Sequence, residues 1–293
     1  MQGLIVENIS SLYKIKVNDK IYEANARGRF KKEDISPVVG DNVEIEVIDE
    51  ENKKAVIDNI LPRTVYIKRP KMSNITQIIL VVSSKNPKPD LLLLDKQLAF
   101  SEFLGINPVI VLNKIDLDKH KEFEKIKEVY EKIGYKVIKT NAKEKDGLDD
   151  LKKVLKGNIS AFSGNSGVGK STLINAIFSD NITLEGEISQ RNKRGKNTTT
   201  STVIYEIDKD TYIADTPGFS TFDISEIEYR DLDKYFKEFQ NVIKDCEYIG
   251  CTHIKEEKCG VKQAIEKGII SESRYDRFCK IYLELKERDK YKY

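Results

Sequence analysis

One stretch of the chain constrains the fold more than any other. Residues 163–171 read S-G-N-S-G-V-G-K-S, and the last eight match the pattern G-x-x-x-x-G-K-[ST]. The apolar run ISAF precedes the match and the helical run STLINAIF follows it. Between a strand and a helix, such glycines let successive backbone N–H groups face a phosphate chain at the helix N-terminus. The sequence therefore predicts an α/β domain that binds a nucleoside triphosphate.

The residues of this phosphate loop have separate expected roles. We expect Lys170 to reach the β- and γ-phosphate oxygens and the Ser171 hydroxyl to bind the Mg²⁺ that accompanies the nucleotide. The predicted phosphate-binding residues are Gly164, Asn165, Ser166, Gly167, Val168, Gly169, Lys170, Ser171 and Thr172. The alternative is a glycine-rich turn with a chance Lys-Ser pair, which the strand and helix context disfavours.

A second phosphate-sensing motif follows another apolar strand. The tetrapeptide D-T-P-G at residues 215–218 comes directly after the run Tyr212 to Ala214. We expect Asp215 to hold Mg²⁺ directly or through water, and the Gly218 N–H to bond the γ-phosphate and respond when it leaves. A threonine of the upstream T-T-T triplet is expected to cap the ion and the γ-phosphate. The predicted catalytic set is Lys170, Thr199, Asp215 and Gly218.

A third motif concerns the base. The apolar run Val109 to Leu112 ends in N-K-I-D, with Asn113, Lys114 and Asp116 as the candidate residues. A carboxylate at Asp116 can accept hydrogen bonds from guanine N1–H and the exocyclic amine, whereas adenine would leave it unpaired. We expect the alkyl stem of Lys114 to lie along the purine and Asn113 to tie this loop to the phosphate loop. The motif favours GTP over ATP.

A further base-contacting loop is predicted after the strand candidate Lys136 to Lys139. Asn141, Ala142 and Lys143 lie where a backbone N–H would meet the guanine carbonyl. The alternative is a polar loop with no part in base binding.

The order of these motifs is unusual. In Ras-like GTPases the base motifs follow the phosphate loop and both switches, whereas here they precede the phosphate loop. The GTPase domain is therefore predicted to be circularly permuted, which leaves the sheet and site intact but moves the chain end to just after the second switch. The segment that responds to the γ-phosphate is then joined directly to the C-terminal region, which could be repositioned on hydrolysis.

The C-terminal region contains a candidate metal site. Cys246, Cys251, His253 and Cys259 give the spacing C-x4-C-x-H-x5-C. Three thiolates and an imidazole form a closed tetrahedral set suited to structural Zn²⁺, without a position for a catalytic water. Scattered buried thiols are the alternative. The fourth cysteine, Cys279, lies in a helical pattern and is expected to be a core residue rather than a ligand.

The remaining pattern predicts a multi-domain α/β protein of three parts. An OB-like barrel of five strands is expected in residues 1–68, a permuted GTPase domain in 70–224 and a zinc-bearing helical domain in 225–293. A linker is expected over Arg63 to Pro70. The expected barrel strands are Gly3 to Val6, Tyr13 to Val17, Ile21 to Ala26, Val43 to Val47 and Ala55 to Ile60. The expected C-terminal helices are Tyr229 to Phe239, Val261 to Lys267 and Glu272 to Lys286.

The composition excludes several other classes of protein. The 293 residues include 50 Lys+Arg and 48 Asp+Glu, so the net charge of +2 indicates neither disorder nor a uniformly basic nucleic-acid coat. No apolar run approaches the ~20 residues of a membrane span, and the N-terminus lacks a basic leader with an apolar core. We therefore expect a cytoplasmic protein without a membrane partner. We also expect it to be a monomer.

Local basic clusters leave alternatives open. Arg27, Arg29, Lys31 and Lys32 are either a solvated turn or a loop that faces nucleic acid. The segment Gln190 to Lys196 is either a flexible solvated loop or one that meets RNA phosphates.

Taken together, the motifs closely resemble the RsgA family of small ribosomal subunit biogenesis GTPases. The resemblance rests on the OB-like barrel, N-K-x-D ahead of G-x-x-x-x-G-K-S, D-T-P-G-F and C-x4-C-x-H-x5-C, and it covers essentially the whole chain. It implies a cytoplasmic GTPase that docks on the 30S subunit late in assembly and holds ribosomal RNA with its barrel and zinc domains. It also implies that the subunit stimulates GTP hydrolysis and thereby release.

Two positions bear on hydrolysis. Phe219 lies where Ras-like proteins carry the water-orienting Gln, so hydrolysis by the protein alone should be slow, on the order of 10⁻⁴ to 10⁻² per second. The family usually has a His before the threonine triplet, where this chain has Asn197, which can orient water but cannot take a proton at neutral pH.

Two other functions remain open from the sequence. One is a non-enzymatic RNA-binding module that uses GTP only as a structural ligand. The other is an ATP-dependent metabolic kinase, which the Asp116 motif disfavours.

Overall fold

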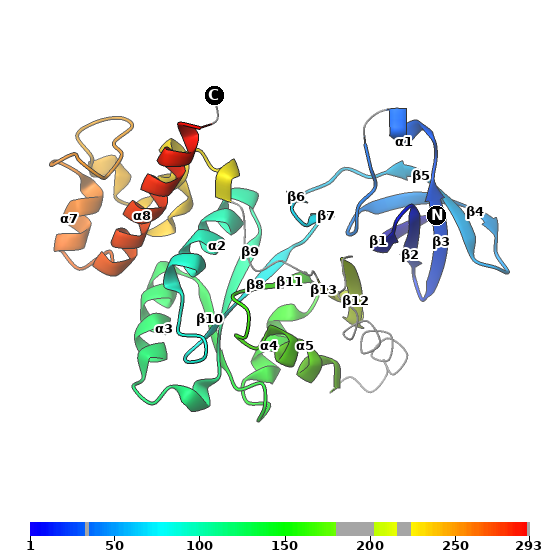
Figure 1. The fold of residues 1–293 in the computed structure, drawn as a ribbon, viewed down its shortest axis with the longest axis horizontal. Helices are drawn as coiled ribbons and strands as arrows, with labels where there is room; N and C mark the ends of the chain where they lie inside the picture. The colour runs from blue at the N-terminus through cyan, green and yellow to red at the C-terminus, as the bar shows by residue number, and fades with distance from the viewer. Residues whose placement is uncertain (33–34, 180–201, 216–223, 292–293) are drawn as a thin grey trace. The chain divides into compact units, whose positions relative to one another are not determined.

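The computed structural model describes residues 1–32, 35–179, 202–215 and 224–291, without the side chains of 31–32 (Figure 1). The chain divides into two compact units, each assembled from several segments. The first unit contains Met1–Ile79, Leu148–Ser163 and Lys170–Phe219, and the second contains Leu80–Gly147, Gly164–Gly169 and Ser220–Tyr293. Both units therefore depend on residues that are far apart in sequence.

The N-terminal strands form a closed barrel in the first unit. They are β1 (Gln2–Ile9), β2 (Leu12–Val17), β3 (Lys20–Ala26), β4 (Asn42–Asp49) and β5 (Lys54–Ile60), with α1 (Arg29–Lys32) between β3 and β4. Their order is β1-β2-β3-β5-β4, and the pairing of β4 with β1 closes the barrel. Alternate side chains point inward, and Ile5, Ile15 and Ile57 have no exposed surface. The predicted five-stranded barrel is confirmed.

The segment after the barrel differs from the linker predicted at residues 63–70. It contains a hairpin of β6 (Tyr66–Lys68) and β7 (Lys71–Ser73). Asp41, which is fully buried, accepts hydrogen bonds from Arg63 Nε at 2.7 Å and Ser73 Oγ at 2.6 Å. The linker prediction was wrong because Tyr66–Lys68 pairs as a strand with Lys71–Ser73, and because Asp41, which is distant in sequence, holds both Arg63 and Ser73.

Three more strands and two helices complete the first unit. They are α4 (Leu148–Leu155), β11 (Ile159–Ser163), α5 (Lys170–Ser179), β12 (Val203–Asp208) and β13 (Thr211–Asp215). β11 runs parallel to β13, and β12 runs antiparallel to it. β12 also pairs with β1 of the barrel, where Val203 lies opposite Glu7. The sheet of the GTPase motifs is therefore continuous with the barrel within this unit.

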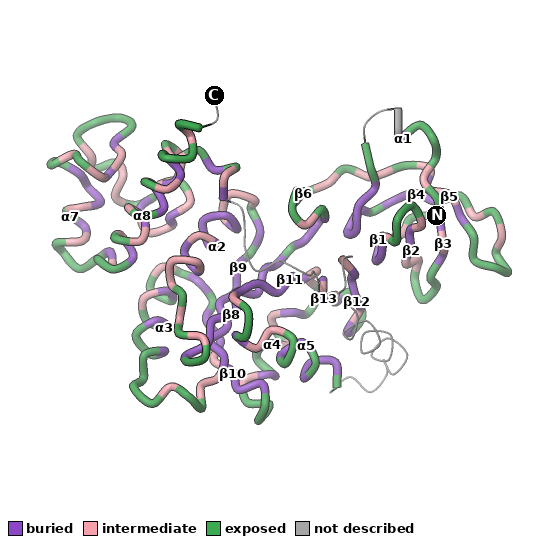
Figure 2. The backbone as a smooth tube through the Cα atoms, viewed as in Figure 1, coloured by how far each residue is buried: buried purple, intermediate pink, exposed green. Residues whose placement is uncertain are grey.

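The second unit holds the other strands of the α/β pattern. β8 (Gln77–Ser83) begins in the first unit and ends in this one, followed by α2 (Leu91–Leu104), β9 (Asn107–Asn113), η1 (Ile115–Leu117), α3 (Glu122–Ile133) and β10 (Lys136–Thr140). β9 and β10 are parallel, and β9 lies between β10 and β8. β8 is buried along its whole length and β9 beyond its first residue (Figure 2), as predicted for covered strands.

All the regular secondary structure of the described residues beyond 223 is helical. These are η3 (Ile224–Glu226), η4 (Tyr229–Tyr235), η5 (Lys237–Phe239), η6 (Ile243–Asp245), α7 (Gly260–Glu266) and α8 (Glu272–Asp289). The continuous helix predicted over 229–239 is wrong, because Phe236 has an extended backbone (φ −108, ψ 97) that separates two 3-10 segments. Its fully buried ring packs on Phe239 and Phe278, with centroids 5.4 and 5.0 Å away. Within the described ranges, none of the helices combines the length and apolar character that a membrane crossing requires.

A buried ionic cluster joins α2 to the C-terminal helices. Arg274 on α8 donates to Asp95 on α2 and to Glu238 on η5, and Arg277 donates to the other oxygen of Asp95. Neither Arg274 nor Asp95 has exposed surface. Tyr130 on α3 donates its hydroxyl proton to the same carboxylate. Three helices and η5 therefore meet at one set of charges inside the second unit.

Candidate functional site

The phosphate loop has the backbone that its glycines predict. Gly164, Gly167 and Gly169 have φ values of +136°, +80° and +102°, a region that L side chains rarely adopt. A Cβ at Gly164 would collide with the Val81 carbonyl, and one at Gly169 would collide with the Asn113 amide. The loop therefore needs glycine for its conformation and for its close contact with β8 and β9.

Asn113 joins the predicted base motif to the phosphate loop. It ends β9 with 1% of its surface exposed, and its Nδ2 donates to Val168 O at 2.9 Å. Its Oδ1 accepts from Thr140 Oγ1 at 3.1 Å and from Ala142 N at 3.3 Å. One amide therefore holds three segments together: the end of β9, the loop after β10 and the phosphate loop.

Lys114 makes contacts that the sequence did not predict. Its Nζ donates to Gly167 O at 2.6 Å and to Asn86 O, and its own carbonyl accepts from Ser84 Oγ at 2.8 Å. Its backbone is in the left-handed region, with φ at 65°. In this structure the ammonium group thus holds the phosphate loop against the loop that follows β8.

The other predicted base residues lie on two neighbouring loops. Asp116 lies on η1 and is exposed. Asn141 is buried and its Oδ1 accepts from Lys143 N at 3.1 Å, while its backbone pairs with Asp146 at 3.0 and 3.2 Å. The Ala142 N–H is directed to Asn113 rather than to solvent. The structure thus brings Asn141 and Ala142 to the base motif, and places Lys143 on the exposed side of the loop.

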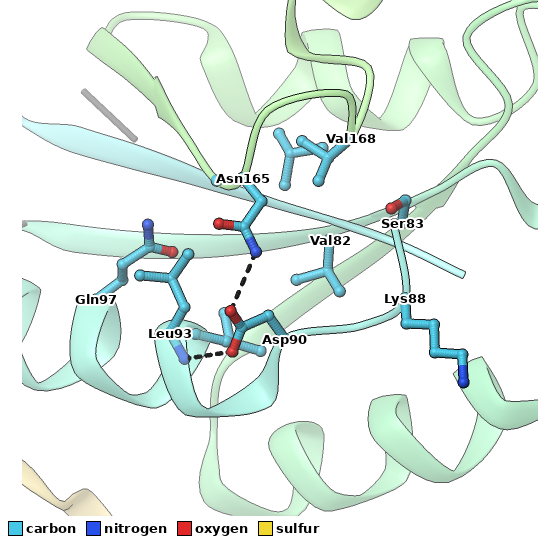
Figure 3. Close-up of a pocket in the computed structure, with 11 residues that line it drawn as sticks. Val82, Ser83, Lys88, Asp90, Leu93, Gln97, Asn165 and Val168 are labelled. Carbon is cyan, nitrogen blue, oxygen red and sulfur yellow. Dashed lines mark hydrogen bonds between the residues drawn. The ribbon is translucent and has the colours of Figure 1, made fainter. Parts of the chain in front are cut away.

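Sequence reasoning missed the loop between β8 and α2. Asp90 is the N-cap of α2 and accepts from Leu93 N at 3.0 Å and from Asn165 Nδ2 at 3.1 Å (Figure 3). Ser83, Lys88, Asp90 and Asn165 line one small pocket beside the phosphate loop. An Asp placed just before the apolar run LLLL is a helix-start signal that could have located this cap. This local signal could not have indicated the hydrogen bond from Asn165.

The phosphate loop continues into α5 at Lys170. Lys170 is half-buried, and burial lowers the pKa of its ammonium group below the ordinary value. An anionic ligand would oppose that shift. Ser171 and Thr172 are exposed in the first turn of α5, and Asp215 is half-buried at the end of β13.

Several predicted residues lie outside the described part of the chain. They are Thr199 and Gly218 of the catalytic set, together with Asn197, Phe219 and the basic segment Gln190 to Lys196.

The four predicted metal ligands are gathered at one point. The three sulfur atoms and the nearer imidazole nitrogen all lie within 4.8 Å of one another. His253 Nδ1 is 3.6 Å from Cys246 Sγ and 3.3 Å from Cys259 Sγ. A tetrahedral zinc ion with Zn–S near 2.3 Å would separate neighbouring ligand atoms by about 3.6–3.8 Å. The four side chains are therefore positioned to bind one zinc ion.

The surroundings of the cluster support a metal site. His253 has φ at 61°, a strained conformation for a side chain of its size, and Gly260 N donates to Cys246 Sγ at 3.3 Å. Burial raises the pKa of the Cys251 thiol to about 12, so a divalent cation would be needed to hold it as thiolate. Cys279 is half-buried on α8 and does not belong to the cluster, as predicted.

Comparison with protein families identifies both N-terminal parts of the chain. Residues 60–225 match the model of the RsgA GTPase family, and residues 2–57 match that of the RsgA N-terminal domain. A curated protein from Clostridium acetobutylicum, named small ribosomal subunit biogenesis GTPase RsgA, is 42% identical over 292 residues and is covered completely, as is this chain. The protein of the same name from Alkaliphilus metalliredigens is 40% identical over 291 residues, with 99% of each chain covered.

Solved structures agree over the same length. The crystal structure of YjeQ from Thermotoga maritima superposes with a TM-score of 0.84 at 36% identity, covering 97% of this chain and 98% of that one. YloQ, described as a circularly permuted GTPase, gives a TM-score of 0.81 at 32% identity, covering 98% and 95%. The predicted permuted order of strands and motifs is therefore confirmed at the level of the fold.

Proposed function

The chain belongs to the RsgA GTPase family, and from that premise we propose that it hydrolyses GTP during late maturation of the small ribosomal subunit. One observation supports the nucleotide part of this proposal above the others. Asn113 and Val168 are 55 residues apart, yet the Asn113 amide bonds the phosphate loop and meets the loop that contains Ala142. In the proposed site, the segments that recognise the base and bind the phosphates are therefore joined by the Asn113 side chain.

In this proposal the nucleotide lies across the junction. The backbone of residues 164–169 and the N-terminus of α5 bind the phosphates, and Lys170 neutralises their charge. Ser171 and Asp215 supply oxygen ligands suited to Mg²⁺, which enters with GTP and offsets charge on the transferring phosphoryl group. Asp116, exposed on η1, accepts two hydrogen bonds from guanine.

The three parts of the chain divide the work. We assign RNA binding to residues 1–68, GTP hydrolysis to 70–224 and a zinc-stabilised docking region to 225–293. Loss of the γ-phosphate is sensed at Asp215 and Gly218, and the chain leads from there directly into η3 and η4. The C-terminal region is therefore the part that responds to hydrolysis. The protein acts as a cytoplasmic monomer that meets the 30S subunit and its rRNA.

The proposed catalysis needs help from the partner. With Phe219 in place of a water-orienting Gln, the protein alone turns over slowly, about 10⁻⁴ to 10⁻² per second. Docking on the 30S subunit raises this rate. Hydrolysis then releases the protein from the subunit.

Phosphate release under multiple turnover tests the enzymatic part. We expect slow release by the protein alone, strong stimulation by 30S subunits and little by 50S subunits. A protein that binds GTP without turnover in either condition would instead be the RNA-binding module with a structural nucleotide. Co-sedimentation with 30S, 50S and 70S particles in a GTP analogue and in GDP tests the partner, and preference for 50S would refute it.

Substituting Asp116→Asn tests the base assignment. The amide cannot accept both guanine hydrogen bonds, so GTP affinity should fall by at least tenfold, which is about 1.4 kcal/mol, and xanthine nucleotides should bind better. Competition against labelled GDP measures both effects. Asp118→Asn is the matched control, because Asp118 lies two residues away and caps α3 through Glu122 N and Phe123 N. Unchanged GTP affinity in Asp116→Asn would contradict the assigned role.

A further inference from the structure

The imidazole of His253 faces two different groups. Its Nδ1 is directed at the sulfur atoms of Cys246 and Cys259, and its Nε2 lies 3.6 Å from Asp233 Oδ2. The ring is almost completely buried, with 1% of the residue exposed, and the Asp233 side chain is 19% exposed. The carboxylate comes from η4, which lies well before the ligand loop in the chain.

Within the described part of the chain, each of these two side chains has one buried atom without a hydrogen-bond partner. Among the described residues, neither His253 Nε2 nor Asp233 Oδ1 has a hydrogen-bond partner. A histidine that binds a metal through Nδ1 is neutral and carries its proton on Nε2. That Nε2–H then needs an acceptor, because a buried donor is rarely left unpaired. Asp233 Oδ2, at 3.6 Å from Nε2, is a few tenths of an ångström beyond hydrogen-bond distance.

The ring has little freedom to find another acceptor. The His253 backbone is in the left-handed region at φ 61°, and the His253 carbonyl accepts a hydrogen bond from Tyr275 OH at 2.6 Å. The ring centroids of Phe239 and Phe278 lie 5.8 and 6.4 Å from that of the imidazole. Asp233 is also fixed, because its carbonyl accepts from Phe236 N at 3.2 Å and from Gln240 Nε2 at 3.0 Å.

We infer that Asp233 is a positioning residue of the metal site. Its carboxylate accepts the Nε2 proton of His253, which fixes the tautomer, holds the ring with Nδ1 toward the three thiolates and makes that nitrogen a stronger ligand. Asp233 does not touch the ion. The fourth ligand is thereby made to depend on η4, a segment of the chain outside the loop that contains the three cysteines.

Zinc affinity of the full-length protein provides the test. Each protein would compete with a chromophoric chelator for Zn²⁺ in a separate titration. The proteins are the wild type and the variants Asp233→Ala, Asp233→Asn and Asp231→Ala. We expect Asp233→Ala to weaken zinc binding about 10- to 100-fold. The zinc affinity of Asp233→Asn should lie between those of Asp233→Ala and the wild type, because the amide oxygen can still accept a hydrogen bond but carries no negative charge. Asp231→Ala is the matched control: Asp231 is on the same η4 and pairs with Lys234 at 2.7 Å, so affinity should stay within about twofold.

The outcomes separate a positioning role from a general effect on folding. Wild-type affinity in Asp233→Ala, or equal losses in Asp233→Ala and Asp231→Ala, would overturn the inference. Should Asp233→Ala fail to fold, Asp233→Asn decides, and unchanged affinity there overturns it. Nitrogen-15 NMR of the zinc-loaded wild type gives a readout independent of affinity: we expect metal-bound Nδ1 and protonated Nε2 for His253. Zinc on Nε2 would also overturn it.

Discussion

At the scale of single residues, Asn113 joins the phosphate loop to the end of β10 and the loop that follows it. Replacing it with alanine removes the partner of Val168 O and of Ala142 N, both inside the protein. We expect Asn113→Ala to lower the free energy of unfolding by about 1–3 kcal/mol and to weaken GDP binding. Urea unfolding and nucleotide titration measure the two effects. The exposed Asn59, replaced in the same way, should change stability by less than about 0.5 kcal/mol; equal effects would remove the special role of Asn113.

Ionisation of the Tyr130 phenol should make the free energy of unfolding depend on pH in the alkaline range. Burial, and then the charge of Asp95, raise the pKa of its phenol well above the ordinary value of 10.0. Because the pKa is higher in the folded state, this contribution is complete below the unfolded pKa and is lost as pH rises above it. We expect the unfolding free energy to fall above pH ~10, and to fall less steeply in Tyr130→Phe. Chemical unfolding from pH 8 to 11 checks this. Tyr291→Phe, at an 80% exposed position, should keep the wild-type slope.

At the scale of elements, the packing of α2 on α8 depends on buried charges. Asp95→Ala leaves Arg274 buried with Glu238 as its remaining carboxylate partner among the described residues, so we expect a loss of about 3–5 kcal/mol. Removing Arg274 as well should cost less than the sum of the single changes. The Lys96–Glu284 pair is a control on the same two helices (Figure 1), because its side chains are 20% and 35% exposed. Lys96→Ala should cost less than about 1 kcal/mol. Additive losses in the Asp95 and Arg274 cycle would contradict the coupling.

Local pattern explains which elements the sequence could predict. The barrel strands are short apolar runs separated by turn residues, and the metal ligands lie in one short loop, so neither prediction needed distant information. The place of Arg274 could not be predicted, because its helix has charges throughout and its partner Asp95 is 179 residues away. The same holds for Asp90, whose capping role is local but whose bond to Asn165 spans 75 residues. The break at Phe236 likewise depends on the Phe278 ring, which comes from another helix.

At the scale of the whole molecule, the metal should stabilise one region and leave another unaffected. We expect a zinc chelator to lower the melting temperature and to speed amide hydrogen exchange in η4, α7 and α8, because Cys259 directly precedes α7 and His253 lies against Asp233 of η4 and Phe278 of α8. Exchange in β1 to β5 should not change, since the barrel has its own closed core. Exchange measured by mass spectrometry distinguishes the regions. Cys259→Ser should reproduce the effect of the chelator and Cys279→Ser should not. A uniform response along the chain would contradict the expectation.

Each unit is built from segments that are far apart in sequence, and this affects when each unit can fold during synthesis. The first strand, β1, pairs with Val203 of β12, and the first unit includes the strand that ends at Asp215. A nascent chain on the ribosome can close the barrel early, but it lacks part of the first unit until those later strands have emerged. The second unit waits longer still, because Asp95 meets its arginine partners only when α8 has been synthesised. Nearly the whole chain must therefore be synthesised before both units can be complete.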